Sequence, residues 1–344
     1  GSINMAFRTT MGILIPLLFS ANVWADNIKI NPNHPDQHVV VKGDTLWDIS
    51  GKFLENPWQW PKLWANNPQI KNPHLIYPGN ILYFSIVDGK PQLSLSKHDG
   101  IRPRIRESAI DQAIKLIPTD AISQFLTSPK VVNATELESS PYVVEIAGEH
   151  LIAGAGDRVY VRSIPAPKSL GYTIYRKGET YTSPESKEIL GYEAKYIADT
   201  TIERSGDPAT LLITQSDSDV RRGDRLMVSN ESELALNFFP RPPEKPISGN
   251  IISVLDGVSQ IGQHNIVVLD KGRVDGLEAG HTLDIYHRGR VVIDPYSPET
   301  NATVKLPDEI AGLLMVFRPF ERVSYALVLE ATQAIHVLDK IQTP

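Results

Sequence analysis

The sequence predicts a multidomain protein in which a small α+β unit, with the order strand, helix, helix, strand (βααβ), is followed by a mainly-β duplicated C-terminal region. Three observations predict this architecture. Residues 38–86 form a compact run bounded by two polar turns, residues from 141 onward alternate apolar and polar side chains, and parts of that alternating region recur later in the chain. The 344 residues, 41% of them hydrophobic, suffice for more than one core, and 26 prolines with 23 glycines favour strands and turns over long helices.

The small unit begins with a strand and a capped helix. The β-branched residues 39–41 suit a strand, and Gly43 allows the chain to turn at little steric cost. Asp44 or Thr45 can accept hydrogen bonds from the free N–H groups of the following turn, and Asp48 completes a capping-box pattern. Apolar side chains then recur on one helical face at Leu46, Ile49 and Phe53.

A second helix and a closing strand complete the unit. The helix is expected from about Gln59 to Ala65, with Pro61 tolerated in its first turn. A turn at Pro78 and Gly79 then leads into a strand. The alternating positions of that strand are Ile81, Tyr83 and Ser85.

Four of the five tryptophans lie in this unit, at Trp47, Trp58, Trp60 and Trp64. A domain this short, without disulfides, needs large aromatic side chains to bury enough surface. We therefore interpret them as core residues. The alternative is that they stack on a sugar or contact a partner protein.

The unit resembles the LysM family of glycan-binding modules, whose pattern is V-x-x-G-D-T-L, a helix pair, an Asn after the second helix, and P-G-x-x-L. The sequence departs from the family at His38, where Tyr is frequent, and in a long, Trp-rich segment between the helices. The matching positions are Val40, Gly43, Asp44, Thr45, Leu46, Ile49, Asn66 or Asn67, Pro78, Gly79 and Leu82.

The resemblance implies a ligand and a site. In the family, chains of N-acetylglucosamine lie in a shallow groove between the loop that enters helix one and the loop that leaves helix two. The implied partner is peptidoglycan, bound without a cofactor, a metal or a catalytic residue. Main-chain N–H and C=O groups exposed at two tight turns can pair with acetamido groups. The implied walls are Gly43, Asp44, Thr45 and Leu46 on one side, and Ile76, Tyr77, Pro78, Gly79 and Asn80 on the other.

The start of the chain is typical of an export signal. Residues 1–4 precede Met5 and are interpreted as a cloning remnant, and Arg8 is followed by the apolar residues 11–23 and by small residues. We expect residues 1–25 to be a signal peptide. The chain has no cysteine, which excludes disulfides, a Cys-linked lipid anchor and thiol catalysis. With a wall glycan as ligand, these features predict a periplasmic protein.

Residues 87–140 are expected to connect the small unit to the β region through short amphipathic helices. Packing against the following domain is the simplest role for their apolar faces, and docking onto a partner protein is the alternative. The first face is Ile110, Ala113, Ile114 and Ile117, and the second, between Pro118 and Pro129, is Ala121, Ile122, Phe125 and Leu126.

The β region is expected to contain two halves, residues 141–236 and 247–344. Alternation predicts strands at 142–146, 157–162 and 172–176. Residues 237–246 contain four prolines and are expected to form an extended, semi-rigid linker between the halves. The internal similarities pair 171–178 with 280–289, 188–191 with 309–312, and 211–224 with 326–339.

The order of these parts resembles the type IV pilus secretin-associated family. The resemblance includes an I-P-T-D-A-I-x-x-F-L connector and an A-G-x-G-D-R-V-Y-V-R run in the β region. The β region is also similar to the C-terminal domain of a flagellar outer-ring protein. The implied partners are the outer-membrane pilus secretin and further copies of the protein in a ring around it. A flagellar ring component is the alternative.

Other function classes fit less well. The net charge of -6 does not favour nucleic-acid binding, and the only local basic cluster is Arg102, Arg104 and Arg106. A LysM-targeted, peptidoglycan-cleaving enzyme is a further alternative, but the nine histidines include neither H-x-H nor H-E-x-x-H. The pair Glu107-Ser108 and the S-x-x-K run at 94–97 lack their companion motifs. We therefore expect a scaffold and not an enzyme.

Overall fold

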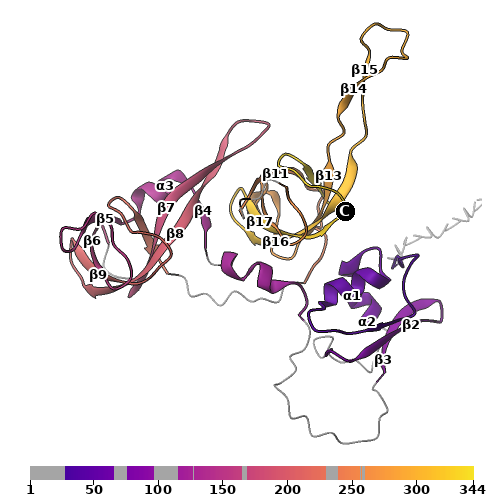
Figure 1. The fold of residues 1–344 in the computed structure, drawn as a ribbon, viewed down its shortest axis with the longest axis horizontal. Helices are drawn as coiled ribbons and strands as arrows, with labels where there is room; N and C mark the ends of the chain where they lie inside the picture. The colour runs from indigo at the N-terminus through magenta and orange to yellow at the C-terminus, as the bar shows by residue number, and fades with distance from the viewer. Residues whose placement is uncertain are drawn as a thin grey trace, which may run out of the picture.

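The computed structural model describes residues 28–65, 76–96, 115–126, 128–164, 169–229, 239–255, 257 and 260–344. These residues form a small α+β unit and two β assemblies (Figure 1). In this described part of the chain, no helix is both long and apolar enough to cross a membrane. Several predictions lie outside the described residues: the signal peptide, Asn66 and Asn67, the basic cluster, Glu107-Ser108, and most of the helix from Ile110.

The small unit has the predicted order of strand, helix, helix, strand. β1 (Gln37–Val39) pairs antiparallel with β2 (Ile81–Val87). Between them come α1 (Leu46–Phe53), the 3₁₀ turn η1 (Pro57–Gln59) and α2 (Trp60–Ala65). A third strand, β3 (Lys90–Ser96), was not expected from the sequence; it pairs with β2 and continues the sheet past residue 86.

Helix α1 begins at the predicted cap. Thr45 has an extended backbone, and its hydroxyl oxygen accepts the N–H of Asp48 at 3.1 Å. The same hydroxyl donates to the Asp48 carboxylate at 2.6 Å. Asp48 therefore closes the turn through the Thr45 side chain and not through the main-chain bond of a full capping box. The buried side of the helix comprises Leu46, Trp47, Ile49, Ser50 and Phe53.

The prediction that the tryptophans form the core of the small unit is confirmed for Trp60 and Trp64. Trp47, Trp60 and Trp64 are each 4% exposed, and Trp58 is partly buried. Trp60 and Trp64 pack inside the small unit. Trp47 instead belongs to a cluster that includes residues of the connector and of the second β assembly. The small unit is thus attached to the rest of the molecule through this side chain.

The first β assembly is a seven-stranded sheet with the order β4-β8-β7-β10-β5-β6-β9. Because β8 also pairs with β9, the strands β8, β7, β10, β5, β6 and β9 form a closed circuit. The predicted strand at 142–146 is confirmed as β5, and β6 and β7 overlap the other two predictions. The bounds are β4 (Lys130–Val132), α3 (Ala134–Ser139), β5 (Tyr142–Ile146), β6 (Arg158–Arg162), β7 (Gly171–Thr182), β8 (Ile189–Arg204), β9 (Ala209–Ser216) and β10 (Arg225–Val228).

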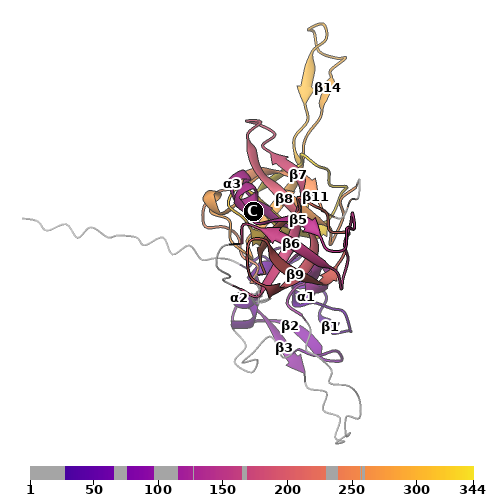
Figure 2. The same ribbon diagram turned by 90° about the vertical axis from the view of Figure 1, so that its left-hand side faces the viewer.

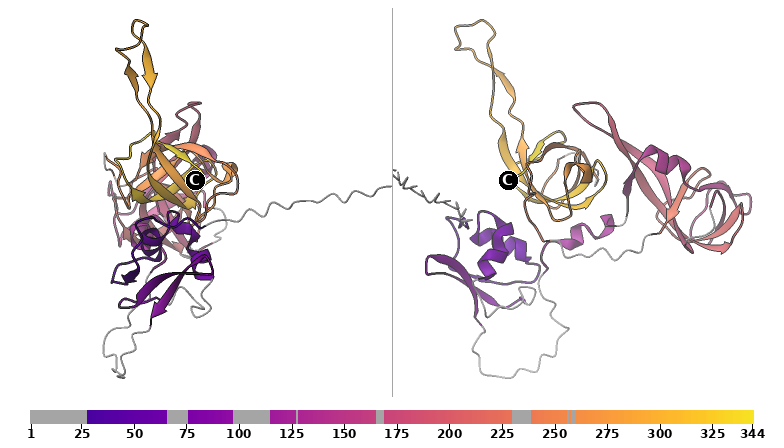
Figure 3. Two further views of the ribbon diagram at one scale, coloured as in Figure 1. Left: turned by 90° about the vertical axis from the view of Figure 1, so that its right-hand side faces the viewer. Right: turned by 180° about the vertical axis from the view of Figure 1, so that it is seen from behind.

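The second β assembly is a closed barrel with the order β11-β12-β17-β16-β13-β18. A two-stranded ribbon, β14–β15, projects from the barrel on the side away from the small unit (Figures 1, 2 and 3). Tyr296, between the two ribbon strands, is 94% exposed. The bounds are β11 (Ser248–Val254), β12 (Ile266–Leu269), η5 (Arg273–Asp275), β13 (Thr282–His287), β14 (Val291–Ile293), β15 (Thr303–Lys305), β16 (Glu309–Pro319), β17 (Ser324–Ala331) and β18 (Lys340–Gln342).

The described end of the connector packs mainly against the second barrel, whereas packing against the following domain was expected. Ile117 and Ile122 are fully buried in a cluster with barrel residues. The prediction of a helix between Pro118 and Pro129 is wrong in type, because the segment forms two 3₁₀ turns, η3 (Thr119–Ala121) and η4 (Ser123–Phe125). Neither turn has a side-chain cap, so packing of the apolar side chains, and not capping, determines the local conformation.

The connector is also held by a buried cation. Arg318 on β16 donates from Nη1 to the carbonyl oxygens of Phe125 at 3.1 Å and Pro129 at 2.6 Å. Burial lowers the pKa of Arg318. A buried guanidinium needs such acceptors, so these two bonds fix the connector on the barrel.

The hairpin β7–β8 of the first β assembly reaches the second barrel. Tyr181 is 1% exposed and belongs to the same cluster as the barrel strands. Arg322 forms a two-bond ion pair with Glu188 at 2.9 Å, and Ser253 donates to Glu179 at 2.8 Å. The two assemblies therefore share an apolar contact bordered by polar bonds.

The Pro-rich segment does not run free where it is described. Arg241 donates its N–H to the Gly280 carbonyl at 3.0 Å, and its own carbonyl accepts the Thr282 N–H at 2.8 Å. The spacer expected at 237–246 is therefore bound along the second barrel from Phe239 onward, because its main chain pairs around His281.

Candidate functional site

The first predicted wall is the turn that enters α1. Gly43 is exposed and has φ 98°, a left-handed conformation that favours glycine. Asp44 is half-buried, and its carboxylate accepts the Val41 N–H at 3.0 Å and contacts His38 Nε2 at 2.8 Å. Lys52 Nζ lies 3.3 Å from His38 Nδ1. Asp44 therefore shapes the turn, and its oxygens are engaged within the protein.

The next two residues of this wall have buried side chains. Thr45 is 5% exposed and Leu46 is 2% exposed. Thr45 caps α1, and Leu46 packs in the core of the small unit. Only main-chain atoms of these two residues are therefore suited to contact a ligand.

The second predicted wall is a tight turn before β2. Asn80 donates its N–H to the Tyr77 carbonyl at 3.0 Å, and the Tyr77 N–H donates to Asn80 Oδ1 at 2.9 Å. Tyr77, Pro78 and Asn80 are half-buried, Gly79 is exposed, and Ile76 is fully buried. The Asn80 side chain thus rigidifies the turn while Ile76 anchors it in the core.

Val40 joins the two walls. Its N–H donates to the Asn80 carbonyl at 2.9 Å, and its carbonyl accepts the Gly79 N–H at 2.7 Å. Val40 itself is 1% exposed. The two turns are therefore side by side and fixed relative to each other.

The exposed part of each wall is a glycine. Gly43 has φ 98° and Gly79 has φ 89°. Apart from each glycine and its chain neighbours, no atom of the described residues lies within 4 Å of the point where a Cβ would stand. A flat ligand can approach the main chain closely at such positions. The paired turns therefore form a shallow surface of peptide groups bordered by Tyr77 and Pro78.

One contact at this site was missed by sequence reasoning. The Leu46 N–H donates to the Lys115 carbonyl at 2.9 Å, and the Trp47 N–H donates to the Leu116 carbonyl at 3.0 Å. The connector thus uses two of the free N–H groups at the start of α1. Only main-chain atoms make these bonds, so no residue type in the sequence signals them.

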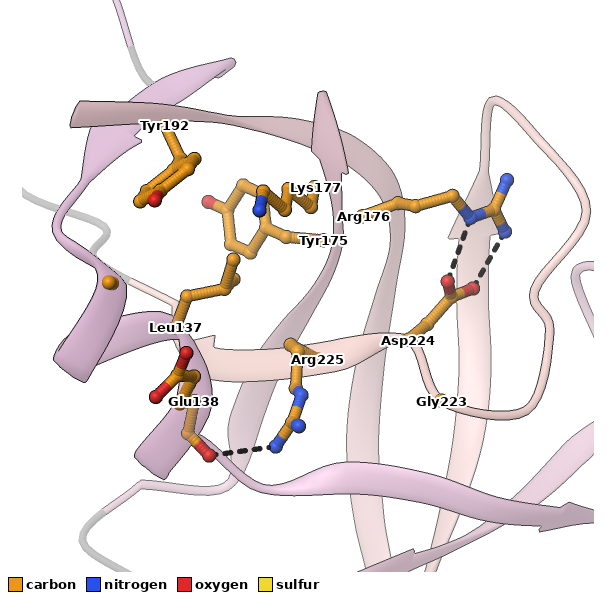
Figure 4. Close-up of a pocket in the computed structure, with 10 residues that line it drawn as sticks. Leu137, Glu138, Tyr175, Arg176, Lys177, Tyr192, Gly223, Asp224 and Arg225 are labelled. Carbon is orange, nitrogen blue, oxygen red and sulfur yellow. Dashed lines mark hydrogen bonds and ion pairs between the residues drawn. The ribbon is translucent and has the colours of Figure 1, made fainter. Parts of the chain in front are cut away.

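A separate cavity of about 320 Å³ lies in the first β assembly, between α3, β7, β8 and β10 (Figure 4). Its cations are each engaged. Arg176 pairs with Asp224 at 2.7 Å, Arg225 donates to the carbonyls of Glu138 and Ser140, and Lys177 lies 4.1 Å from the centre of the Tyr192 ring. These bonds are explained by the fold.

Residues 38–85 thus form a small βααβ unit in which two turns are paired. Residues 38–85 match the LysM domain family. LysM domains bind glycans that contain N-acetylglucosamine, so this domain indicates peptidoglycan binding. The family match thus agrees with the resemblance that the V-x-x-G-D-T-L and P-G-x-x-L runs indicated.

A curated relative adds a partial match. The chain is 40% identical over 58 residues to the uncharacterized protein YqbP of Bacillus subtilis (strain 168). The match covers 14% of this chain and 26% of that protein. The chain therefore spans about a quarter of the length of this relative.

Proposed function

We propose that this protein is a non-enzymatic periplasmic scaffold. Its LysM domain binds peptidoglycan, and its β region associates as a ring with the outer-membrane type IV pilus secretin, which it anchors to the cell wall. The observation that carries the proposal is the pair of turns fixed together at Val40, with an exposed glycine on each. Such a surface fits a polysaccharide that is recognised through its acetamido groups.

The binding mode follows from what each wall leaves accessible. The glycan lies across Gly43 and Gly79 and contacts the half-buried Asp44, Tyr77, Pro78 and Asn80. Thr45, Leu46 and Ile76 contribute through their main chains. The connector carbonyls of Lys115 and Leu116 already occupy the N–H groups of Leu46 and Trp47. A glycan that uses those two donors must therefore displace the connector, which weakens binding while the connector stays docked.

The β region supports the duplication expected from the sequence. The circuit β5-β6-β9-β8-β7-β10 has the same order as the barrel β11-β12-β17-β16-β13-β18. The bridge between Ala153 and Val220 corresponds to the bridge between Ile261 and Ile335. Likewise, Gly223 donates to Val143 at 2.8 Å as Leu338 donates to Ile251 at 2.7 Å. The shared strand order supports the proposal that the two assemblies are copies of one β module.

Ring formation allows weak individual grooves to hold the assembly on the cell wall. A single shallow LysM groove offers few contacts. Several copies attached to one secretin present many grooves to the same wall mesh, and such multivalency raises retention on the order of 10² to 10⁴. The force on a channel during pilus extension and retraction is then shared among the copies.

Co-sedimentation with purified sacculi tests glycan binding. Gly79→Gln places a side chain over the groove, and Gly89→Gln is the matched control. Gly89 is also exposed, has φ 73°, and lies at the other end of β2, about 20 Å away for a strand of this length. We expect Gly79→Gln to lose most sacculus binding and Gly89→Gln to retain it. Equal binding by both variants contradicts the groove.

The partner and the absence of activity need separate measurements. Removal of residues 26–85 is expected to abolish sacculus binding and to leave co-purification with the pilus secretin unchanged. Recovery of a flagellar ring protein in place of the secretin favours the alternative named above. A zymogram tests the rival class, since a clearing band shows a wall-cleaving enzyme.

A further inference from the structure

Two histidines that are far apart in the sequence meet on one side of the second barrel. His287 ends β13, whereas His336 and Asp339 lie in the turn before β18. One ligand atom from each of the three side chains lies within 4.8 Å of the others. Nδ1 of His287 is 3.2 Å from Oδ1 of Asp339, and Nδ1 of His336 is 3.9 Å from Oδ2. Both imidazoles therefore present the same ring nitrogen to one carboxylate.

The three groups combine a buried carboxylate with two exposed imidazole rings. The Asp339 side chain is 5% exposed, and its Oδ2 accepts the main-chain N–H of His336 at 2.8 Å. His287 is 45% exposed and His336 is 51% exposed. Zinc holds imidazole and carboxylate ligands at about 2.0–2.2 Å, which separates ligand atoms by about 3.4 Å in a tetrahedron. Modest rotation of the two exposed rings therefore reaches that geometry.

The corresponding place in the first β assembly differs in a specific way. There the Asp224 carboxylate accepts the main-chain N–H of Arg221 at 2.8 Å and forms an ion pair with Arg176 at 2.7 Å. Arg221 precedes Asp224 by three residues, just as His336 precedes Asp339 by three. Arg176 lies on β7 near the pairing of β7 with β10, and His287 lies at the end of β13 near the pairing of β13 with β18. A guanidinium is always charged and cannot ligate a metal. In the second barrel both arginine positions hold imidazoles, while the carboxylate is retained.

The charges around the cluster are compatible with a bound cation. Arg288, next to His287, is occupied by the Leu338 carbonyl and the Asn250 side chain. Glu309 pairs with His287 across the strands β13 and β16, so its carboxylate lies on the same face of the sheet. Lys340 pairs with Tyr286, the neighbouring residue of β13, on the opposite face.

We propose that His287, His336 and Asp339 bind a divalent first-row transition-metal ion of the zinc type. The three protein ligands leave a fourth position for water or for a group from a neighbouring molecule. The ion joins the end of β13 to the turn before β18. Because β13 leads into the β14–β15 ribbon, the bound ion also stiffens the root of that ribbon.

Titration with Zn²⁺ tests the site. The protein is used without a histidine tag and after treatment with chelator, and heat of binding is recorded for Zn²⁺ alone. We expect one ion per chain, and affinity at least about tenfold weaker in His287→Ala and in His336→Ala. His150→Ala is the matched control, because His150 is an exposed histidine of the first β assembly. Absence of binding by the parent protein overturns the proposal, as does unchanged affinity in His287→Ala.

Thermal unfolding supplies an independent readout. An ion that binds only the folded state raises the melting temperature. We expect Zn²⁺ to raise it for the parent protein and for His150→Ala, and not for His287→Ala. Near-UV circular dichroism of His287→Ala without metal establishes that the variant is folded. An equal rise in a folded His287→Ala overturns the proposal.

Discussion

The residues of the two paired turns act mainly through their backbones. Gly43 and Gly79 adopt left-handed conformations over open space, and Thr45, Leu46 and Ile76 point their side chains inward. In the proposed binding mode, sugar recognition depends on peptide groups that are already fixed before the ligand arrives. Substitutions that alter backbone conformation therefore act on stability and on binding together.

Two glycines of the small unit give opposite predictions. Gly43→Ala forces a Cβ into φ 98° and is expected to lower the free energy of unfolding by about 1–2 kcal/mol. Gly51→Ala, inside α1, places its Cβ at an ordinary 3.5 Å from Pro57 and is expected to be stabilising by up to about 1 kcal/mol. Chemical denaturation measures both. Equal effects of the two substitutions contradict the assigned backbone conformations.

Asp284 on β13 predicts a pH dependence of stability. Burial, aided by the nearby Glu330 carboxylate, raises the pKa of Asp284 to about 6. The unfolded pKa is about 3.9, so the folded state holds this proton more tightly. The stabilising contribution of the protonated group is complete below about pH 4 and is lost as the pH rises to about 6.

Asp284→Asn removes this dependence. We expect the variant to unfold with a smaller loss of stability between about pH 4 and 6, and to be more stable at pH 7 by about 1–3 kcal/mol. Urea denaturation across this pH range measures both effects. Glu330→Gln removes only the neighbouring charge and should give a smaller change of the same sign. A slope unchanged in Asp284→Asn contradicts the raised pKa.

At the scale of elements, the connector is the part that determines how the LysM domain is held. Its carbonyls cap the start of α1, its apolar side chains enter the cluster shared with the second barrel, and Arg318 fixes its last carbonyls. The connector is therefore a structural joint as well as a link between domains.

Ile117→Ala tests this joint. Ile117 is fully buried, so the truncation is expected to cost about 2–5 kcal/mol and to favour release of the connector. Hydrogen exchange at the Leu46 and Trp47 amides should become faster, and sacculus binding should increase. Ile152→Ala removes the same atoms from a side chain that is 50% exposed and should change neither. Unchanged exchange in Ile117→Ala contradicts the capping role.

Much of the small unit follows from local signals in the sequence. The Thr45 cap, the apolar face of α1 and the buried tryptophans all have residue types that favour one structure. The sequence also contains a signal for the β2–β3 hairpin, because the dipeptide Asp88-Gly89 is typical of a type I′ turn. In the structure these residues have φ 51° and 73°. Pro91 argues against a strand at this position, because proline within a sheet is confined mainly to edge strands.

The docking contacts left no such signal. Lys115 and Leu116 bind through carbonyl oxygens, which every residue has. Likewise, His287 and His336 are separated by 49 positions, and only closure of the barrel brings them together. Local patterns therefore predicted elements of the small unit, whereas contacts that depend on the packing of distant elements required the three-dimensional structure.

At the scale of the whole molecule, the two β assemblies are coupled through the β7–β8 hairpin. Tyr181 is buried against the second barrel, and the Arg322–Glu188 pair borders this contact. The ion pair is largely exposed and contributes little. The apolar contact therefore provides most of the coupling, and the assemblies are expected to unfold together.

Tyr181→Ala is expected to separate their unfolding. Loss of this buried ring should cost about 3–5 kcal/mol and split the calorimetric transition into two. Tyr296→Ala, at a residue that is 94% exposed, is the control and should leave the transition unchanged. A single, uniformly shifted transition in Tyr181→Ala contradicts coupling through the hairpin.

The ribbon has a practical consequence for mapping the neighbours of the protein. Within the described sheets, β14 and β15 pair only with each other, and the Leu306 N–H donates to the Arg290 carbonyl at 3.0 Å where the ribbon leaves the barrel. A photo-reactive amino acid in place of Tyr296 is therefore expected to label whatever molecule lies beside the ribbon, without disturbing the barrel. Excision of the ribbon beyond that last bond gives the companion sample, in which the same adducts should disappear.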